Sequence, residues 1–440
     1  MRYSIRPILL LLLGLALTPA SSCLPSPGVG EGGAGRGAGG EGSLAAVAAS
    51  AAPGAPAAVA SLRGMGSAGM EAILALEKAD PALSRSPVFH AALDAVCGQH
   101  DCAASHLYWY TDLAAARAEA RRSGKPILSL RLLGRLDEEL SCANSRYFRA
   151  VLYPDETISG LLRDRFVLHW ESVRPVPKVT VDFGDGRRLV GTVTGNSIHY
   201  VLDPNGRIVD ALPGLNGPGA FRRFLKRAAA EASRMAALSD ADFIHELTAF
   251  HAACLGDLKS VLMDDLRQAG AESPEQAAWM TVTTGLWGGI REVRAWRASE
   301  RAASKSAAEL PVLWAVSPDV VHPAPPEVKP SAVADLHFAD AKLSAASRRL
   351  LLAKAGTWMK LDDEKAAVGR FEGLIAEDTV RNEYLLHSAL HTWLAASRQV
   401  PDLAAFNEQV YARLFLTPSS DPWLGLAPAE LYAVMRPLTP

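Results

Sequence analysis

Residues 125–146 read KPILSLRLLGRLDEELSCANSR. The apolar run from Ile127 to Leu133 follows a proline, and its length suits a buried β-strand. A polar loop separates this run from Cys142, which lies where a helix is expected to begin. A helix N-terminus can lower the pKa of a thiol and make it reactive. The stretch therefore predicts a strand, a loop and one cysteine at the start of a helix.

Helix and strand signals alternate on both sides of this stretch. Upstream, a short aromatic strand at 107–110 precedes an alanine-rich helix at 112–121, which stops at Ser123-Gly124. Downstream, Asp155 can cap a second helix. The remaining signals are a strand, two hairpins with Asp-Gly or Asn-Gly in their turns, and a closing helix, at 166–170, 179–193, 198–211 and 218–235.

This order, with a thiol after the second strand, resembles the thioredoxin superfamily over about residues 106–232. Three phrases carry the resemblance: GKP at 124–126, DRFV at 164–167 and YVLDPNGR at 200–207. The resemblance implies an α/β thioredoxin-like domain, with a mixed central sheet and flanking helices, at 106–235. An all-α domain at 236–440 is expected to follow it.

The resemblance also implies a chemistry for Cys142. Proteins of this superfamily carry Cys-x-x-Cys, in which the first thiolate attacks a substrate disulfide and the second cysteine resolves the mixed disulfide. Cys142 matches the attacking cysteine, and Ser145 stands in the place of the resolving one. A Cys-x-x-Ser site can form or isomerise a mixed disulfide, but its turnover needs an outside thiol. The implied function is thiol–disulfide chemistry on exported proteins, with a thiol reductant as a second partner.

Other features favour a redox-inactive scaffold whose helical domain binds a partner. The superfamily has a cis-proline before the strand that leads to the aspartate turn, and here that place falls near Ser197, after Asn196. Residues 135–141 lengthen the loop before the cysteine. The acids at 137–139 oppose the effect of the helix on the thiol pKa. The sequence leaves both functions open.

The first 22 residues have the features of an export signal, with a basic start, a short apolar core and small residues before Cys23. Their end resembles a bacterial lipobox, which implies a lipid on Cys23; ordinary signal cleavage near the same place is the alternative. Residues 23–67, rich in Gly, Ala, Pro and Ser, are predicted to form a disordered tether. We therefore expect a protein anchored to a membrane through its lipid, in the cell envelope and facing the periplasm or the cell exterior. The net charge of −2 and the scattered basic residues predict no nucleic-acid partner.

A helical lead-in is predicted at 68–105, and it ends with a close pair of cysteines, Cys97 and Cys102. Export places the pair in an oxidising compartment, where a disulfide persists. The sequence therefore predicts a Cys97–Cys102 bridge. Metal binding with His100 is the alternative, and it is disfavoured because the spacing fits no standard zinc pattern.

From residue 240 onward the apolar residues recur at three- and four-residue steps, which predicts helices. Cys254 lies on the apolar face of the first and is predicted to be a core residue. Glu383, His387 and His391 share one side of a helix at 379–397, and histidines at this spacing can chelate a metal. The neighbouring apolar stripe instead favours a polar border on a packed helix, so no metal and no cofactor are expected. Further predictions are a proline-rich crossing at 317–330 and helices at 274–304, 333–360, 362–377 and 403–414.

Overall fold

The computed structural model describes residues 48–51, 54–192, 195–270, 330–356 and 363–422. The predicted signal peptide, Cys23, most of the predicted tether, the helix at 274–304 and nearly all of the proline-rich crossing lie outside the described residues.

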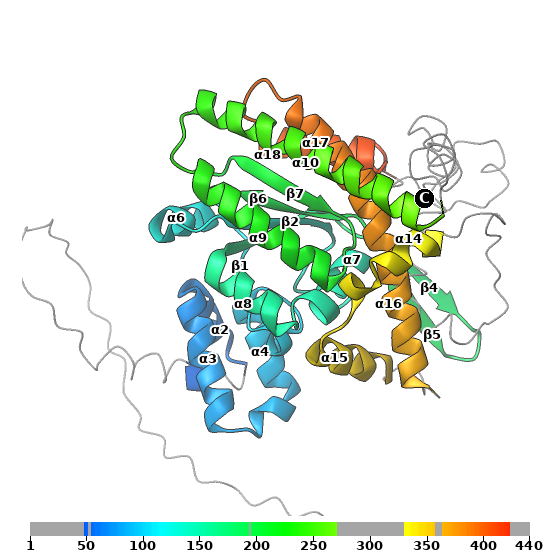
Figure 1. Cartoon of the computed structure of the whole chain (residues 1–440). Helices are drawn as coiled ribbons and strands as arrows, with labels where there is room; N and C mark the ends of the chain where they lie inside the picture. Colours follow the sequence, from blue (N-terminus) through cyan, green and yellow to red (C-terminus); the bar gives the residue numbers. More distant parts are fainter. Residues whose placement is uncertain (1–47, 52–53, 193–194, 271–329, 357–362, 423–440) are drawn as a thin grey trace, which may run out of the picture. The chain divides into compact units, whose positions relative to one another are not determined.

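A five-stranded mixed sheet forms the centre of the described structure, with the strand order β1-β3-β2-β6-β7 (Figure 1). Strands β1 and β2 run parallel to β3, whereas β6 runs antiparallel to both β2 and β7. Every residue of β2 and β6 is buried, as expected for central strands covered on both faces. The strands are β1 Trp109–Tyr110, β2 Ile127–Leu133, β3 Val167–Arg174, β6 Ser197–Leu202 and β7 Ile208–Pro213.

The helices around the sheet begin at the residues that the sequence predicts. Asp112 and Asp155 cap α6 and α8, each accepting a hydrogen bond from a backbone N–H of the first turn. Helix α9 packs on β6, β7 and α8 (Figure 1), and its buried residues include Phe221, Phe224 and Leu225. The bounds are α6 Leu113–Ser123, α7 Ala143–Tyr147, α8 Glu156–Arg165 and α9 Pro218–Met235, and α7 continues into a π-helical turn, η2 Phe148–Leu152.

The lead-in forms helices around a small apolar core of its own. Helix α2 falls inside the range predicted as a disordered tether, so residues 56–64 differ from that expectation. The reason is packing, because Leu62 is fully buried in the same cluster as Ile73 and Phe89. The elements are α2 Pro56–Gly64, α3 Ser67–Ala79, the 3-10 turn η1 Leu83–Arg85, α4 Pro87–Cys97 and α5 Cys102–Ser105.

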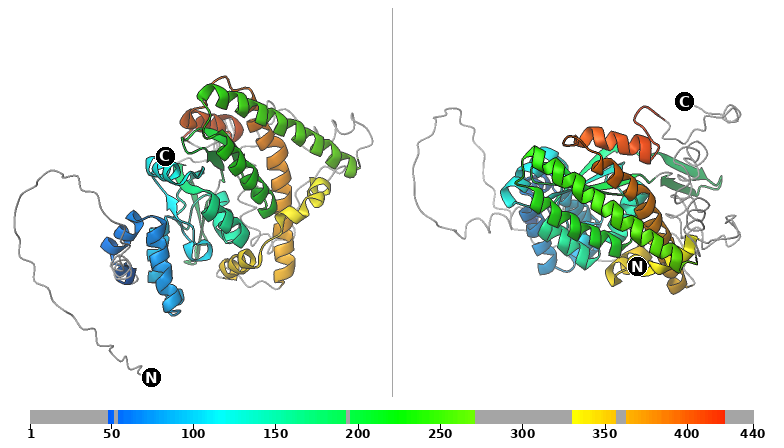
Figure 2. Two further views of the ribbon diagram at one scale, coloured as in Figure 1. Left: turned by 60° about the vertical axis from the view of Figure 1, so that its left-hand side comes forward. Right: turned by 45° about the horizontal axis from the view of Figure 1, so that its top comes forward.

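The C-terminal helices pack directly against the sheet, and α10 lies beside α17 (Figure 2). One cluster of buried apolar side chains extends from Leu107 to Phe415, so the boundary predicted at residue 236 does not separate two cores among the described residues. Within the helix predicted at 333–360, the described residues up to 356 form three shorter pieces. The elements are α10 Asp240–Gln268, α14 Pro330–Leu336, η3 Phe338–Ala341, α15 Ala345–Gly356, α16 Glu364–Arg381, η4 Asn382–His387, α17 Ser388–Ala395, α18 Leu403–Gln409 and η5 Val410–Leu414.

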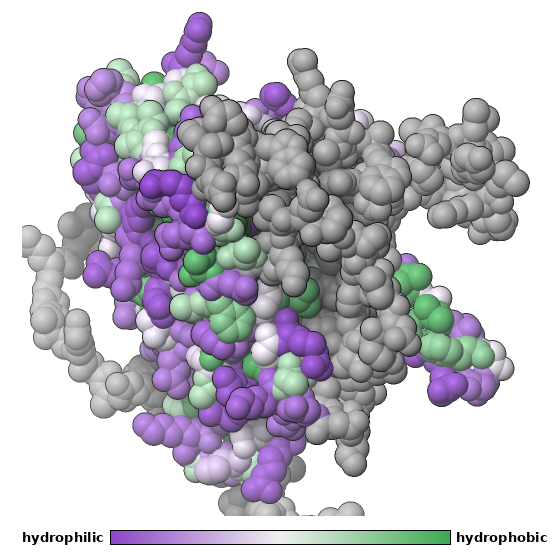
Figure 3. Space-filling view, turned by 45° about the vertical axis from the view of Figure 1, so that its right-hand side comes forward, coloured by the Kyte–Doolittle hydropathy of each residue, from purple (hydrophilic) through white to green (hydrophobic). Residues whose placement is uncertain are grey.

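A separate antiparallel hairpin is formed by β4 Lys178–Asp182 and β5 Arg188–Thr192. Val179, Val181 and Phe183 on this hairpin are 45%, 42% and 54% exposed. Apolar residues are visible beside polar ones where the hairpin projects (Figure 3). Among the described residues, no helix combines the length and the apolar composition that crossing a bilayer requires.

Candidate functional site

The two residues of the Cys-x-x-Ser pattern come together at the start of α7. Cys142 is the residue before this helix, and its backbone N–H donates to the Leu133 carbonyl at the end of β2. Its Sγ lies 3.5 Å from Oγ of Ser145, and that oxygen lies 2.8 Å from the Cys142 carbonyl and 2.6 Å from Oγ of Ser141. The thiol therefore occupies the place at the head of a helix that the sequence predicts.

The thiol is nevertheless inaccessible, because Cys142 and Ser145 are both 0% exposed. The loop before β6 lies against α7: a Cβ on Gly195 would come within 2.7 Å of both Cβ of Ala143 and Oδ1 of Asn144. Only a residue without a side chain fits so close to the helix start. Cys142 is thus part of the packed core of the domain.

Tyr411 and Thr417, near the C-terminal end of the described residues, form hydrogen bonds with the loop that precedes β6. Asn196 and Ser197 lie where the resemblance leads one to look for a cis-proline, and the described residues contain no cis peptide bond. The Asn196 carbonyl accepts a 3.1 Å hydrogen bond from the Tyr411 hydroxyl, and Nδ2 of Asn196 donates to Oγ1 of Thr417. Burial, together with the nearby Cys142 thiol, raises the pKa of Tyr411 well above its usual value, so the phenol stays neutral. Tyr411 and Thr417 therefore hold Asn196 at the start of β6, and Tyr411 lies near enough to Cys142 for the two groups to interact.

The three acids before Cys142 are engaged with cations. Asp137 and Glu138 both pair with Arg135. Glu139 pairs with His100 and with Lys354. Each of these carboxylates therefore has at least one cationic partner.

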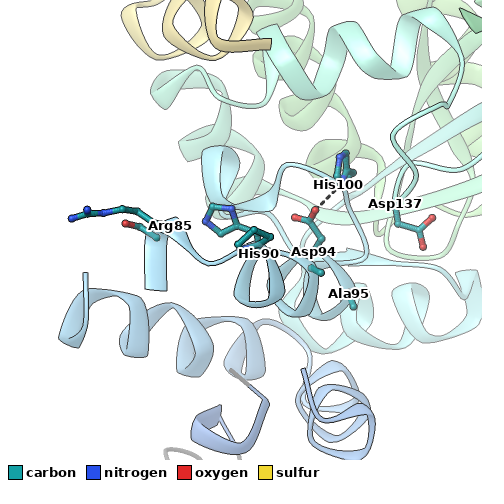
Figure 4. A pocket seen from close by; sticks show the side chains of 9 residues that line it. Arg85, His90, Asp94, Ala95, His100 and Asp137 are labelled. Atoms are coloured by element: carbon teal, nitrogen blue, oxygen red, sulfur yellow. Dashed lines mark ion pairs between the residues drawn. The ribbon is translucent and has the colours of Figure 1, made fainter. Parts of the chain in front are cut away.

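Cys97 and Cys102 are joined by a disulfide, and the residues between them enter an ion-pair network. Nδ1 of His100 lies 2.7 Å from Asp94, and Nε2 faces Glu139. Hydrogen bonds to these two carboxylates raise the pKa of His100 to about 9. The pair of Asp94 and His100 borders a pocket of about 550 Å³, whose lining includes His90 of α4 (Figure 4).

The raised pKa of His100 makes stability depend on pH. The protonated form is favoured in the folded state, so its contribution is complete below the unfolded pKa of about 6.5 and is lost as the pH rises to about 9. We expect His100→Gln to lower the free energy of unfolding at pH 6 and to leave it almost unchanged at pH 10. Urea titrations of both proteins between pH 6 and pH 10 measure this difference. A difference that does not shrink as the pH rises would show that the charge of His100 is not involved.

The histidines predicted to border the last long helix are not at the surface. His387 and His391 are each 1% exposed, and they face His251 of α10 and Asp210 of β7. The polar border that the sequence predicts on this packed helix is thus buried against other elements. The sequence offers one signal for His251, because it lies four residues after Leu247 and so falls on the apolar face of its helix. No local signal identifies Asp210. Cys254 is buried on the same helix, as predicted, and burial raises its pKa to about 11.

Comparison of the chain with protein-family models, with curated proteins and with solved structures found no match.

Proposed function

We propose that this protein is a redox-inactive scaffold with a thioredoxin-like fold, held at the cell envelope by a lipid on Cys23, and that it works by binding. The strand order β1-β3-β2-β6-β7, with two parallel and two antiparallel pairings, supports the fold. The position of Cys142 between β2 and the next helix supports it too.

The burial of Cys142 carries the functional part of the proposal. A thiolate must approach a disulfide sulfur to attack it, so exchange depends on access to the thiol. Cys142 has no exposed surface, the loop at Gly195 packs against the two residues of α7 that follow Cys142, and Tyr411 binds the same loop at Asn196. Ser145 cannot resolve a mixed disulfide. A buried cysteine without a second thiol suits a structural role in the core and not thiol–disulfide exchange.

The contact with a partner is assigned to the β4–β5 hairpin. Val179 and Val181 alternate along β4 and Phe183 directly follows the strand, so the sequence places all three on one face of the hairpin. Leu189 is paired directly with Val181 on the neighbouring strand and extends the same face. Exposed apolar side chains that gather in this way are typical of contact surfaces. The partner would be an exported protein that presents an apolar surface of its own.

The rate at which Cys142 is alkylated tests this proposal. We expect iodoacetamide at pH 7.5 to modify Cys142 in the native protein at least about a thousandfold more slowly than in the urea-unfolded chain, because reaction requires an opening of the core. Quenched time points read by peptide mass spectrometry give the rate. Cys254, a second buried thiol, serves as an internal comparison. Fast alkylation in the native state, or mixed disulfides with exported proteins that vanish in Cys142→Ala, would instead establish the monothiol oxidoreductase.

A further inference from the structure

A group of buried polar side chains lies where α10 and the η4–α17 helix pack on β7. It consists of Asp210, His251, His387 and His391, here called the histidine cluster, and each of these residues is at most 1% exposed. They come from three segments that are far apart in the sequence and that the sheet and its covering helices bring together (Figure 1).

Three members of the cluster are placed as metal ligands would be. One carboxylate oxygen of Asp210 and one ring nitrogen each of His251 and His391 all lie within 4.8 Å of one another. Nδ1 of His251 is 2.8 Å from Nδ1 of His391. These possible ligand atoms, from one strand and two helices, are close enough together to bind one metal ion.

The outer hydrogen bond of His251 matches the pattern of metal-binding histidines. Its Nε2 lies 3.0 Å from the Val209 carbonyl, which can only accept, so Nε2 carries the proton and donates. Nδ1 of the neutral ring is then unprotonated: it accepts a hydrogen bond from Nδ1–H of His391, and its lone pair could instead bind a metal ion. Histidines that bind metals commonly give their second N–H to a backbone carbonyl or a carboxylate in this way.

His387 supplies an independent observation. Its Nδ1 lies 3.1 Å from Oε2 of Glu383, which is again a carboxylate behind an imidazole. Its Nε2 makes a long ion-pair contact of 3.5 Å with Oδ1 of Asp210. At this distance Nε2 makes no well-formed hydrogen bond, and a metal ion bound by both groups would satisfy this buried nitrogen. This atom is aimed at the same carboxylate that faces His251 and His391.

We propose that Asp210, His251 and His391 bind a divalent transition-metal ion of the zinc class, with His387 beside them as a fourth ligand. Imidazole nitrogens together with one carboxylate suit Zn²⁺, whereas Ca²⁺ and Mg²⁺ require oxygen ligands. A site enclosed on all sides is typical of a structural metal. The ion would tie β7 to α10 and α17 and thereby stabilise the packing of the C-terminal helices on the sheet.

Metal analysis of the full chain tests the site without any substitution. We expect protein purified without chelator, and protein that is stripped and then reloaded with ZnCl₂, to hold about one zinc per chain and to melt at a higher temperature than the stripped protein. Reloading with CoCl₂ should produce the visible absorption of tetrahedral cobalt. Wild-type protein that takes up neither ion, with no shift in melting temperature, would overturn the proposal.

Variants then separate this cluster from other histidines. His391→Gln and Asp210→Asn keep the size of the side chain but lose a ligand, and each should weaken zinc binding by about 100-fold or more. His245→Gln is the matched control, because His245 is exposed on the same helix as His251. His100→Gln is a second control, because His100, Asp101 and Glu139 form another His–acid group. Zinc lost in His100→Gln and retained in both cluster variants would contradict the assignment.

Discussion

Replacing Arg149 with alanine is expected to lower the free energy of unfolding by about 3 kcal/mol, which is a typical cost of removing one partner of a buried ion pair. Arg149 is 1% exposed, and its Nη1 lies 2.9 Å from Oδ2 of Asp101. Nη2 donates to the Glu139 carbonyl at 3.0 Å and to Oγ of Ser141 at 3.3 Å. One guanidinium therefore joins the disulfide loop of the lead-in to the loop that precedes Cys142.

The decrease in the free energy of unfolding should lie at the lower end of what breaking a buried ion pair costs, because Lys354 still pairs with Asp101 in the variant. Urea unfolding followed by circular dichroism measures it. Arg149→Lys should restore little, since an ammonium cannot reproduce the fork of donors that reaches three acceptors. Arg122→Ala is the control, because Arg122 is an exposed arginine in a helical pair with Glu119, and it should change stability very little. Equal effects of Arg149→Ala and Arg122→Ala would show that the buried network does not hold the two regions together.

Replacing Tyr411 with alanine is expected to expose the thiol of Cys142. Tyr411 is fully buried, and loss of a buried aromatic ring costs about 3–5 kcal/mol, part of it from the cavity left behind. The variant also leaves the Asn196 carbonyl without the hydroxyl that it binds. The lost free energy should mainly weaken the packing of the segment around Tyr411 on the loop at Asn196. Alkylation of Cys142 should then accelerate about 100-fold, since each 1.4 kcal/mol corresponds to a factor of ten.

The control for this experiment removes a ring at the other end of the sheet. Phe243 is fully buried and packs under Arg207, which follows β6. In the antiparallel pairing of β2 with β6, Leu202 lies opposite Ile127 and Ser197 opposite Leu132, so this end is remote from Cys142. Phe243→Ala should destabilise the protein without the same gain in alkylation. If the two variants react alike once matched for stability, opening is global and the segment around Tyr411 is not a local cover.

Local signals in the chain predict most of the central elements. Asp112 and Asp155 stand at the starts of α6 and α8 because each supplies an oxygen to an unpaired N–H of the first helical turn. The turn between β6 and β7 contains Gly206, whose φ of 90° is a conformation that glycine adopts without strain. These features depend on a few neighbouring residues, so they can be found without knowing the fold.

Longer-range packing accounts for the places where expectation and structure differ. Helix α2 forms within glycine- and alanine-rich sequence because Leu62 inserts among Ile73 and Phe89 of later helices. His387 and His391 are buried because His251 and Asp210 approach them from other segments. Periodicity along one helix gives the side on which a residue lies, but not what covers that side.

The chain alone therefore establishes a strand, a loop and a cysteine ahead of a helix, since backbone preferences and capping act within a few residues. The burial of that cysteine is decided by residues distant in sequence, such as Tyr411 and Asn196, which come together only after folding. The burial of a thiol and the clustering of possible metal ligands both depend on tertiary packing. The side chains that decide them are far apart in the sequence, so no local sequence pattern reveals them.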